Sequence, residues 1–494
     1  MFAHAFLPSL RRAALLAPLL LAACAVGPNY HRPALSKSAS YGADATSPPA
    51  DSGLEGARPS LVSGMDIPAA WWRVFHSDSL DALVERALKN SPTVKAAEAA
   101  LRSAREQVAA QRGAYYPSLS ASVQPSHQEF ANTLSSPLNS NAEIFDLTTA
   151  QVSVSYVPDL FGANARAVES AAAQRDQQRF ELEAARLTLA SNVVVAAVQD
   201  ALLRAEIDQT QAIIADQQRT FASFERQYAL GQASKADLAA QKTLLAQAQA
   251  SLPPLRKQYR VNRDLLSALV GQTPGEPLDT HFDLQSLSLP EPLPLSLPAQ
   301  LVEHRPDVRI AEAQLRAASA QIGVAEAARW PNLEIDANAG SAALRFFPQF
   351  NSATNFWNVA GTLTQPIFQG GTLLHRERAA RAAYDQAAQQ YQATVVSAFQ
   401  NTADVLHALW TDADALHAAE AAQSASAQSL EISRRQLGLG DVSRLAVLSA
   451  EQADGQARLA LLQARANRYA DAAALFQALG GGWWNAGKPA PATP

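Results

Sequence analysis

The chain has 494 residues and a single cysteine, and alanine supplies much of its 48% hydrophobic content. One thiol excludes an internal disulfide and any zinc site built from several cysteines. The formal net charge is −5 and becomes −7 once a leader containing two arginines is removed, so no basic stripe for nucleic acid is expected.

Residues 1–23 have the order of a secretory signal. Arg11 and Arg12 precede an apolar run and a few small residues. The run is about ten residues long, whereas a membrane-spanning helix needs about 20, so we expect cleavage and not a transmembrane helix. The end of the signal, Leu-Ala-Ala-Cys, resembles a lipobox, which predicts that Cys24 is acylated and becomes the mature N-terminus. An ordinary signal with a chance cysteine is the alternative. Ala25, in place of the aspartate typical of inner-membrane retention, favours the outer membrane.

Residues 24–90 are predicted to form an N-terminal linker. The stretch from about 34 to 66 is rich in Ser, Gly, Pro and Ala, a composition typical of extended chain. Residues 483–494 are predicted to be a flexible C-terminal tail.

Between these ends the sequence is duplicated. The segment from Asn90 aligns without gaps to the segment from His304, and identical residues meet at matching positions: Pro92 with Pro306, Val94 with Val308, Glu98 with Glu312, Leu101 with Leu315 and Pro117 with Pro331. Each half is too long for a solenoid repeat, so a whole structural unit is duplicated. We assign residues 91–271 to the first repeat, 272–305 to an inter-repeat linker and 306–482 to the second repeat.

Each repeat is predicted to begin with a helix, from Pro92 to about 114 in the first and from Pro306 in the second. Two segments with alternating apolar and polar residues follow in each, which predicts four strands per chain. The apolar positions are Leu119, Ala121, Val123, Val152, Val154, Leu333, Ile335, Ala337, Trp357, Val359 and Leu363.

Serine, asparagine and carboxylate residues occupy the other face of these strands. A soluble sandwich would alternate too, but a water-filled membrane barrel requires this pattern on every strand, with aromatic residues at the interface. Such residues cluster between the third and fourth strands: Phe346, Phe347, Phe350, Phe356 and Trp357. Four open strands cannot sit in lipid with unpaired edges, and known barrels start at eight strands, so a membrane barrel would have to be shared between chains.

A long helix without proline follows each strand pair, at about 164–228 and 372–436. About 65 residues at 1.5 Å each extend roughly 100 Å. Glycine ends each helix, and another helix is predicted to return from Ser234 and from Ser443. Pro253-Pro254 is predicted to interrupt the first returning helix, and the second is predicted to run on.

These features together resemble one family. The lipobox, the GPNYHRP stretch after it, the duplicated halves and the turns YALGQASKADL and LGLGDVSRLAV are similar to outer-membrane efflux channels of the TolC type, in the lipoprotein branch typified by OprM and NodT. The resemblance implies a mainly α fold with a membrane β-barrel. In this fold three chains supply four strands each to a 12-stranded barrel, and their long helical hairpins form a periplasmic α-barrel. The linkers would form an equatorial belt.

The resemblance also implies partners and a location. They are a homotrimer, a periplasmic adaptor, an inner-membrane pump of the RND type and the lipid of a Gram-negative outer membrane. The channel would conduct drugs or other small molecules passively from the periplasm to the exterior. The hairpin tips would dock the adaptor, at Gly231, Ser234, Asp237, Gly440 and Ser443.

The periplasmic gate is expected at the second tip. In relatives a motif like LxDVLDA places a ring of acids there. The matching stretch here is LAVLSA, with Ala446 and Ser449 in place of the two acids. We therefore predict a mainly hydrophobic closure by Leu445 and Leu448. Asp441 is the electrostatic alternative, unless it is the N-cap of the returning helix.

No HExxH, GxSxG, GxGxxG or P-loop pattern occurs, so we expect no enzyme, no cofactor and no metal. Two other classes remain open. A periplasmic adaptor also has lipidation and long hairpins but needs glycine-rich strands flanking a single hairpin. A structural coiled-coil lipoprotein would leave the four strands unexplained.

Overall fold

The computed structural model describes residues 25–34, 41–42, 59–129, 131, 140, 142–276, 278–289, 292–296, 298–344 and 350–486. Cys24, Phe346 and Phe347 lie outside these ranges. The chain divides into two compact units whose segments alternate along the sequence. Unit 1 comprises Met1–Pro33, Leu101–Gln178 and Ala311–Tyr391, and unit 2 comprises Ala34–Ala100, Arg179–Ile310 and Gln392–Pro494.

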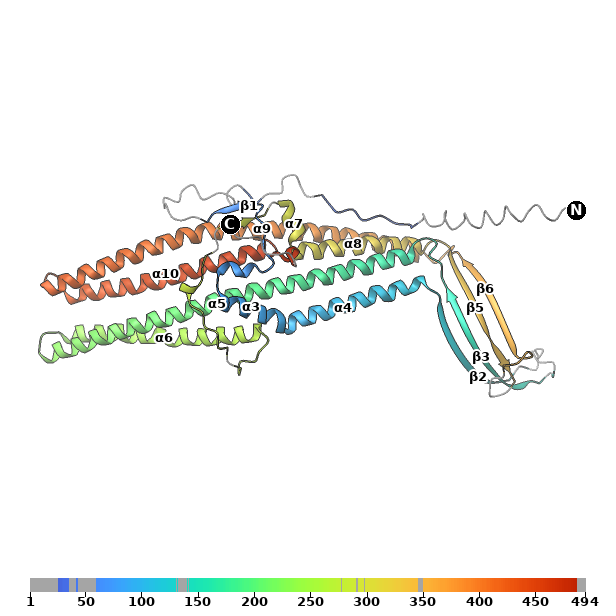
Figure 1. Ribbon diagram of the computed structural model, residues 1–494, viewed down its shortest axis with the longest axis horizontal. Coiled ribbons are helices and arrows are strands. Elements are labelled where there is room, and N and C mark those ends of the chain that lie inside the picture. The colour runs from blue at the N-terminus through green and yellow to red at the C-terminus, as the bar shows by residue number, and fades with distance from the viewer. Residues whose placement is uncertain are drawn as a thin grey trace. The chain divides into compact units, whose positions relative to one another are not determined.

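Unit 1 contains the predicted sheet (Figure 1). Its strands are β2 (Ser118–Glu129), β3 (Ile144–Tyr156), β5 (Asn332–Ala343) and β6 (Asn355–Thr364), all antiparallel in the order β2-β3-β5-β6. The first repeat supplies β2 and β3, and the second supplies β5 and β6. The prediction of four strands is confirmed, and β2 and β6 are the two edges of this sheet.

The helices also follow the predicted order. Each repeat has a first helix, a long helix and a returning helix, and their bounds are α4 (Pro92–Arg112), α5 (Ala163–Ala229), α6 (Lys235–Leu269), α8 (Pro306–Ala327), α9 (Thr372–Leu439) and α10 (Arg444–Ala478). Alanine, glutamine, leucine, arginine and glutamate dominate them, and all five are good helix formers. Helices α4, α5, α8 and α9 contribute residues to both units.

One helix prediction is wrong. Helix α6 is continuous over 35 residues and includes Pro253 and Pro254. The two prolines lack N–H donors, and their rings crowd the preceding turn. Both rings lie on the exposed face, where water can bond the freed carbonyls, and the Ser251 hydroxyl donates to the Ala248 carbonyl at 2.8 Å. Helix α6 thus continues through both prolines with the freed carbonyls open to water. Helix α10 runs on, as predicted.

Among α-helices and strands, the described part of unit 2 holds four elements that the linker predictions missed, one of which is helix α7 (Pro298–His304). Helix α3 (Asp78–Asn90) is capped by Ser77 and buries Leu80, Leu83, Val84 and Ala87. Short strands β1 (Leu61–Ser63) and β4 (Leu293–Leu295) pair in parallel. Helix α3 could have been predicted from the sequence, because its buried residues follow the i, i+3, i+4, i+7 spacing of an amphipathic helix. Three-residue strands carry no such period.

The core of unit 2 is aromatic. Trp71 stacks on Phe476 of α10, with ring centroids 5.3 Å apart and planes at 17°. Phe75 is fully buried beside Tyr469, whose hydroxyl donates to the Leu287 carbonyl at 2.6 Å. Residues that flank the repeats are thus packed onto the returning helix α10.

The two repeats end in the same way. Gly271 and Gly480 adopt positive φ of 78° and 97° after α6 and α10. A Cβ atom on Gly271 would lie 3.0 Å from the Asn90 carbonyl oxygen, and one on Gly480 would lie 2.7 Å from that of His304. Asn90 and His304 are the residues from which the repeats align. Glycine is therefore needed both for the left-handed turn and for the close approach. This geometry matches Gly271 to Gly480.

Candidate functional site

The sheet of unit 1 has one apolar and one polar face. The register places Leu119, Val154, Ala337 and Val359 in one row across the four strands. The neighbouring row on the opposite face is Ser120, Ser153, Asn338 and Asn358. Since successive side chains alternate between faces, each strand follows the same two-sided pattern.

The apolar face is exposed in the single chain. Leu119 is 73% exposed, Val359 64% and Trp357 78%. On the polar face the Ser155 hydroxyl donates to Glu334 Oε1 at 3.3 Å. A surface of this kind, apolar on one side and hydrogen-bonding on the other, can separate lipid from water.

The predicted aromatic cluster is only partly on one face. Trp357 and the 70% exposed Phe350 are both accessible, but Phe356 precedes Trp357 and therefore occupies the polar face, opposite Gly340.

The opposite end of the sheet has its own aromatic group. Phe161 stacks on Trp330, with centroids 5.3 Å apart, where β3 leads into α5 and α8 leads into β5. Tyr116, Ile367 and Phe368, which lie close to the helix ends in sequence, are 74%, 94% and 87% exposed. The Asp159 carboxylate accepts from the Asn164 and Ala165 amides and so orients the start of α5.

The GPNYHRP stretch is fixed onto helices of unit 1. Arg166 of α5 donates to the carbonyls of Val26 and Gly27 at 3.1 Å each and to Asn29 Oδ1 at 2.9 Å. Gly27 packs against Gly323 of α8 so closely that a Cβ atom would lie 2.4 Å from the Gly323 Cα. We call residues 25–33 the tether.

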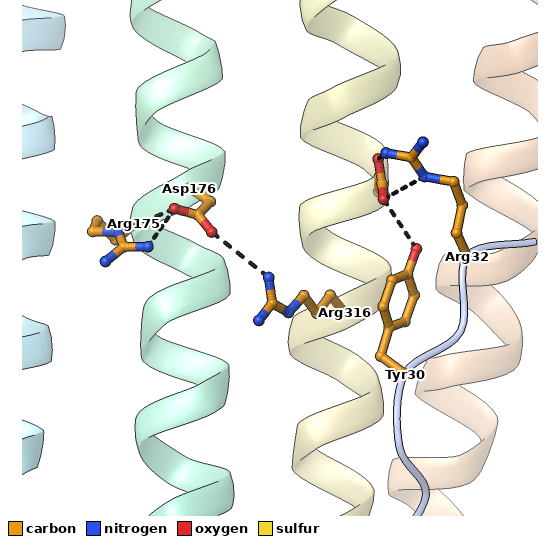
Figure 2. A network of polar contacts seen from close by, with 6 residues as sticks. Tyr30, Arg32, Arg175, Asp176 and Arg316 are labelled. Carbon is orange, nitrogen blue, oxygen red and sulfur yellow. Dashed lines mark hydrogen bonds and ion pairs between the residues drawn. The ribbon is translucent and has the colours of Figure 1, made fainter. Parts of the chain in front are cut away.

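Glu312 of α8 holds the other end of the tether, and Figure 2 shows Tyr30 and Arg32 beside this helix. Both of its carboxylate oxygens accept from Arg32, at 2.8 Å each, and the Tyr30 hydroxyl donates to Oε1 at 3.4 Å. Burial and the Glu312 charge raise the pKa of Tyr30 above its usual value, so its hydroxyl stays protonated. Nearby, Arg316 of α8 lies 3.9 Å from Asp176 of α5.

The resemblance had drawn on Gly27, Tyr30 and Pro33 without assigning them contacts. Their partners Arg166, Glu312 and Gly323 were not predicted. The alignment of the two repeats matches Glu312 to Glu98, but Glu98 forms its ion pair with Arg186 at 2.9 Å. Duplication therefore preserved the residue and changed its partner.

The hairpin tips of unit 2 are built alike. Gly231 and Gly440 have φ of 73° and 81°, and the residue after each donates its amide to the carbonyl five positions earlier. Ser234 and Ser443 then cap α6 and α10 through bonds to Asp237 N and Ala446 N. The five predicted tip residues thus lie in two matching turns. Arg444 also lies 5.8 Å from the Phe224 ring of the other hairpin.

The gate candidates do not share one environment. Leu445 is 69% exposed, whereas Leu448 is 5% exposed and packs within the hairpin. Ser449 and Asp441 are exposed. Ser443 is the N-cap, so the alternative in which Asp441 caps the helix is wrong. Leu445 is the apolar candidate left free at this tip.

Among the described residues, α5 is long enough and contains one stretch apolar enough to cross a membrane, but 67% of that stretch is buried within the structure. Packing accounts for its apolar residues.

Comparison with known proteins identifies the architecture. The outer membrane efflux protein family matches residues 83–272 and 297–481, the two repeats with little beyond them. The pyoverdine export outer membrane protein OpmQ of Pseudomonas aeruginosa is 29% identical over 450 residues, covering 89% of this chain and 94% of OpmQ. Outer membrane protein OprJ of the same species is 28% identical over 481 residues, covering 96% of each chain.

A solved structure agrees in fold. The outer-membrane channel OprN superposes with a TM-score of 0.83 at 24% identity, covering 93% of this chain and all of that one. The TolC-like fold class predicted from the sequence is therefore confirmed. The chain belongs to the outer membrane efflux protein family and is an outer-membrane efflux channel.

Proposed function

We propose that three copies of this chain form the exit duct of a tripartite efflux system. The observation that carries this proposal is the exposed apolar face of the four-stranded sheet, backed by a polar face in the same register. An open sheet in lipid would leave the β2 and β6 edge groups unpaired at several kcal/mol each, roughly. Three copies pairing β6 to β2 would close a barrel of twelve strands.

The duct needs energy from elsewhere. We propose a periplasmic adaptor docked at the two hairpin tips and an inner-membrane pump of the RND type behind it. The matching turns at Gly231 and Gly440 support this, because two similar tips per chain would present six similar sites around a trimer. The cargo would be drugs or other small molecules.

The test is conductance. We expect the purified full chain to open long-lived channels in a planar bilayer and to migrate as a trimer in detergent. An adaptor-type or structural coiled-coil lipoprotein would give neither channels nor a detergent-resistant trimer, and that result would reject the proposal.

We further propose that Cys24 carries the lipid anchor in the outer membrane. The tether supports this, since it fixes Val26 to the Phe161 carbonyl through a 3.1 Å backbone bond, close to the strand ends. Cys24→Ser should abolish metabolic labelling with palmitate and leave the signal uncleaved. Label that persists in this variant would contradict acylation at Cys24.

We also propose that the periplasmic end closes mainly by hydrophobic contact at Leu445. Three exposed leucines around one axis would exclude water from a narrow pore. Leu445→Ser should therefore raise conductance and vancomycin sensitivity more than Asp441→Asn does. If Asp441→Asn alone relieves a strong block by multivalent cations, the gate is electrostatic and this proposal fails.

A further inference from the structure

A basic groove lies on the first hairpin of unit 2, apart from the sheet, the tether and the tips. It encloses about 430 Å³ between α5, α6 and the segment that follows α6, and it is lined by Arg204, Ile207, Arg256, Tyr259, Arg260 and His281. The conduit function described above makes no use of it.

Helical spacing builds the two walls. On α5, Asp200, Arg204 and Ile207 follow each other at four and three residues and so share one face. On α6, Arg256 and Arg260 are four residues apart, which places their stems about 6 Å apart along the axis.

The third wall is fixed by a buried ion pair. Asp200, fully buried, lies 3.7 Å from Arg263 Nη1. Arg263 in turn donates to the carbonyls of Thr280 and Leu278. The buried Phe282 anchors the same segment, so His281 is held at the rim of the groove.

The three arginines have no partner of their own. Within the residues that the structure describes, the guanidinium groups of Arg204, Arg256 and Arg260 make no hydrogen bond and no ion pair. Other arginines on these hairpins do, such as Arg186 with Glu98 and Arg434 with Glu451. Even Asp208, one turn from Arg204 on α5, is not paired with it. Asp200 acts electrostatically on Arg204 but forms its ion pair with Arg263, so the groove keeps an excess of positive charge, which favours an anionic ligand.

The arrangement of side chains in the groove restricts the class of ligand that can bind. A guanidinium binds a carboxylate through two parallel hydrogen bonds, and two such forks one helical turn apart select two carboxylates at that separation. Ile207 and the ring of Tyr259 also line the groove and add apolar surface, which suits a carbon skeleton better than a bare inorganic ion.

We propose that this groove binds organic ligands carrying two carboxylates, either as free dicarboxylic or tricarboxylic acids or as neighbouring acidic side chains of a peptide. The three arginines hold the carboxylates, and Ile207 and Tyr259 contact the skeleton. The groove gives the channel a ligand site on its helical part.

The test measures binding of citrate and of tetraglutamate to the purified full chain by calorimetry at low salt. We expect one of the two to bind, and which one does identifies the source of the carboxylates. R204Q/R256Q/R260Q should weaken that binding at least tenfold. The matched control K235Q/K242Q/K257Q removes the same charge from exposed positions of α6 outside the groove and should change it less than twofold.

Three results would overturn the proposal. If neither probe binds the wild type, the groove is not a carboxylate site. This conclusion holds even where the only effect of the arginine variant is loss of the trimer. Equal weakening in both triple variants would show nonspecific charge attraction. Full retention of binding in R204K/R256K/R260K would rule out recognition by guanidinium forks. Helix content and oligomeric state of each variant, measured alongside, separate loss of binding from loss of fold.

Discussion

The two repeats share one plan but bury their returning helices to different degrees. Within the chain, α6 buries four of its 35 residues, while α10 buries 13 of its 35. Val261 and Leu265 of α6 are 58% and 49% exposed, and the structurally matching residues of α10 are Ala470 and Ala474. Duplication has therefore left one helix packed inside the chain and the other with apolar side chains for a neighbour to cover, as the proposed trimer would.

The largest effect should come from the pair of leucines that both repeats bury. Leu266 and Leu475 are each 0% exposed and lie one turn before the helix ends. Leu266→Ala and Leu475→Ala should each lower the free energy of unfolding by about 2–5 kcal/mol, because each leaves a cavity. Guanidinium titration of the detergent-solubilised protein measures this.

Leu265→Ala is the control for the comparison. Its side chain is half exposed in the chain, so it should cost much less than Leu266→Ala when subunits are dissociated. An equal cost in dissociated chains would mean that α6 is as well packed as α10.

Lysine substitutions on the apolar face of the sheet should have the same effect in both repeats. Val154 of β3 and Ile335 of β5 lie on the same face. A lysine in mid-bilayer costs roughly 2–4 kcal/mol on the lipid side, so Val154→Lys and Ile335→Lys should both reduce assembled trimer in the outer membrane. Ser153→Lys, on the other face, should not. If the lysine is tolerated equally at positions 153 and 154, the sheet does not face lipid.

A second difference concerns one polar position in the returning helices. Asn262 of α6 donates to the Ala196 carbonyl at 2.9 Å, whereas the matching residue of α10 is Asp471. Burial and the neighbouring Asp412 raise the pKa of Asp471 to about 7, and Arg468 opposes the shift only in part.

Since the folded pKa is raised, the folded state binds the extra proton between about pH 4 and pH 7, and stability falls as pH rises through that window. Asp471→Asn, which restores the first repeat's residue type, should raise the thermal unfolding midpoint at pH 8 and leave it nearly unchanged at pH 4. Circular dichroism at the two pH values checks this. A gain of equal size at both would show that the charge is not the cause.

The smallest effect should be at the tips. Ser234 and Asp237 form a complete capping box, but the second tip has Ala446 in place of the acid. Asp237→Ala should cost about 0.5–1 kcal/mol of helix stability, and Ala446→Asp should gain a similar amount. Amide hydrogen exchange in the first turns of α6 and α10 measures both effects. Unchanged amide protection in either variant would show that the capping box does not stabilise that tip.

Most of the fold could be predicted because its signals are periodic. The two-residue period located all four strands, and the long proline-free runs located α5 and α9. Pro253 misled because low helix propensity does not by itself end a long helix where the proline lies on the exposed face and water can bond the freed carbonyls. The two-residue pattern already implied that the neighbours Phe356 and Trp357 lie on opposite faces of the sheet, which a cluster of aromatic residues read as one girdle overlooks.

The candidate sites were less predictable, because many of their contacts are not local in the sequence. Turn residues such as Gly231 and Ser234 have local roles, and the sequence placed them correctly in the tips. The contacts of Arg166 and Glu312, and the groove at Arg204, join segments that are distant along the chain, so no spacing in the sequence could reveal them.

The tether also has a consequence for the order of folding. Arg32 and Glu312 are 280 residues apart, so their contact closes most of the mature chain into a loop. Such a contact cannot form while the chain is still being secreted through its first repeat, because Glu312 has not yet emerged. If Cys24 is acylated as we propose, lipid attachment precedes this contact, and the nascent chain is anchored at its N-terminus until α8 emerges. The contacts of Val26 and Asn29 with Arg166 can form with the first repeat alone, whereas docking of Tyr30 and Arg32 on Glu312 marks the arrival of the second repeat.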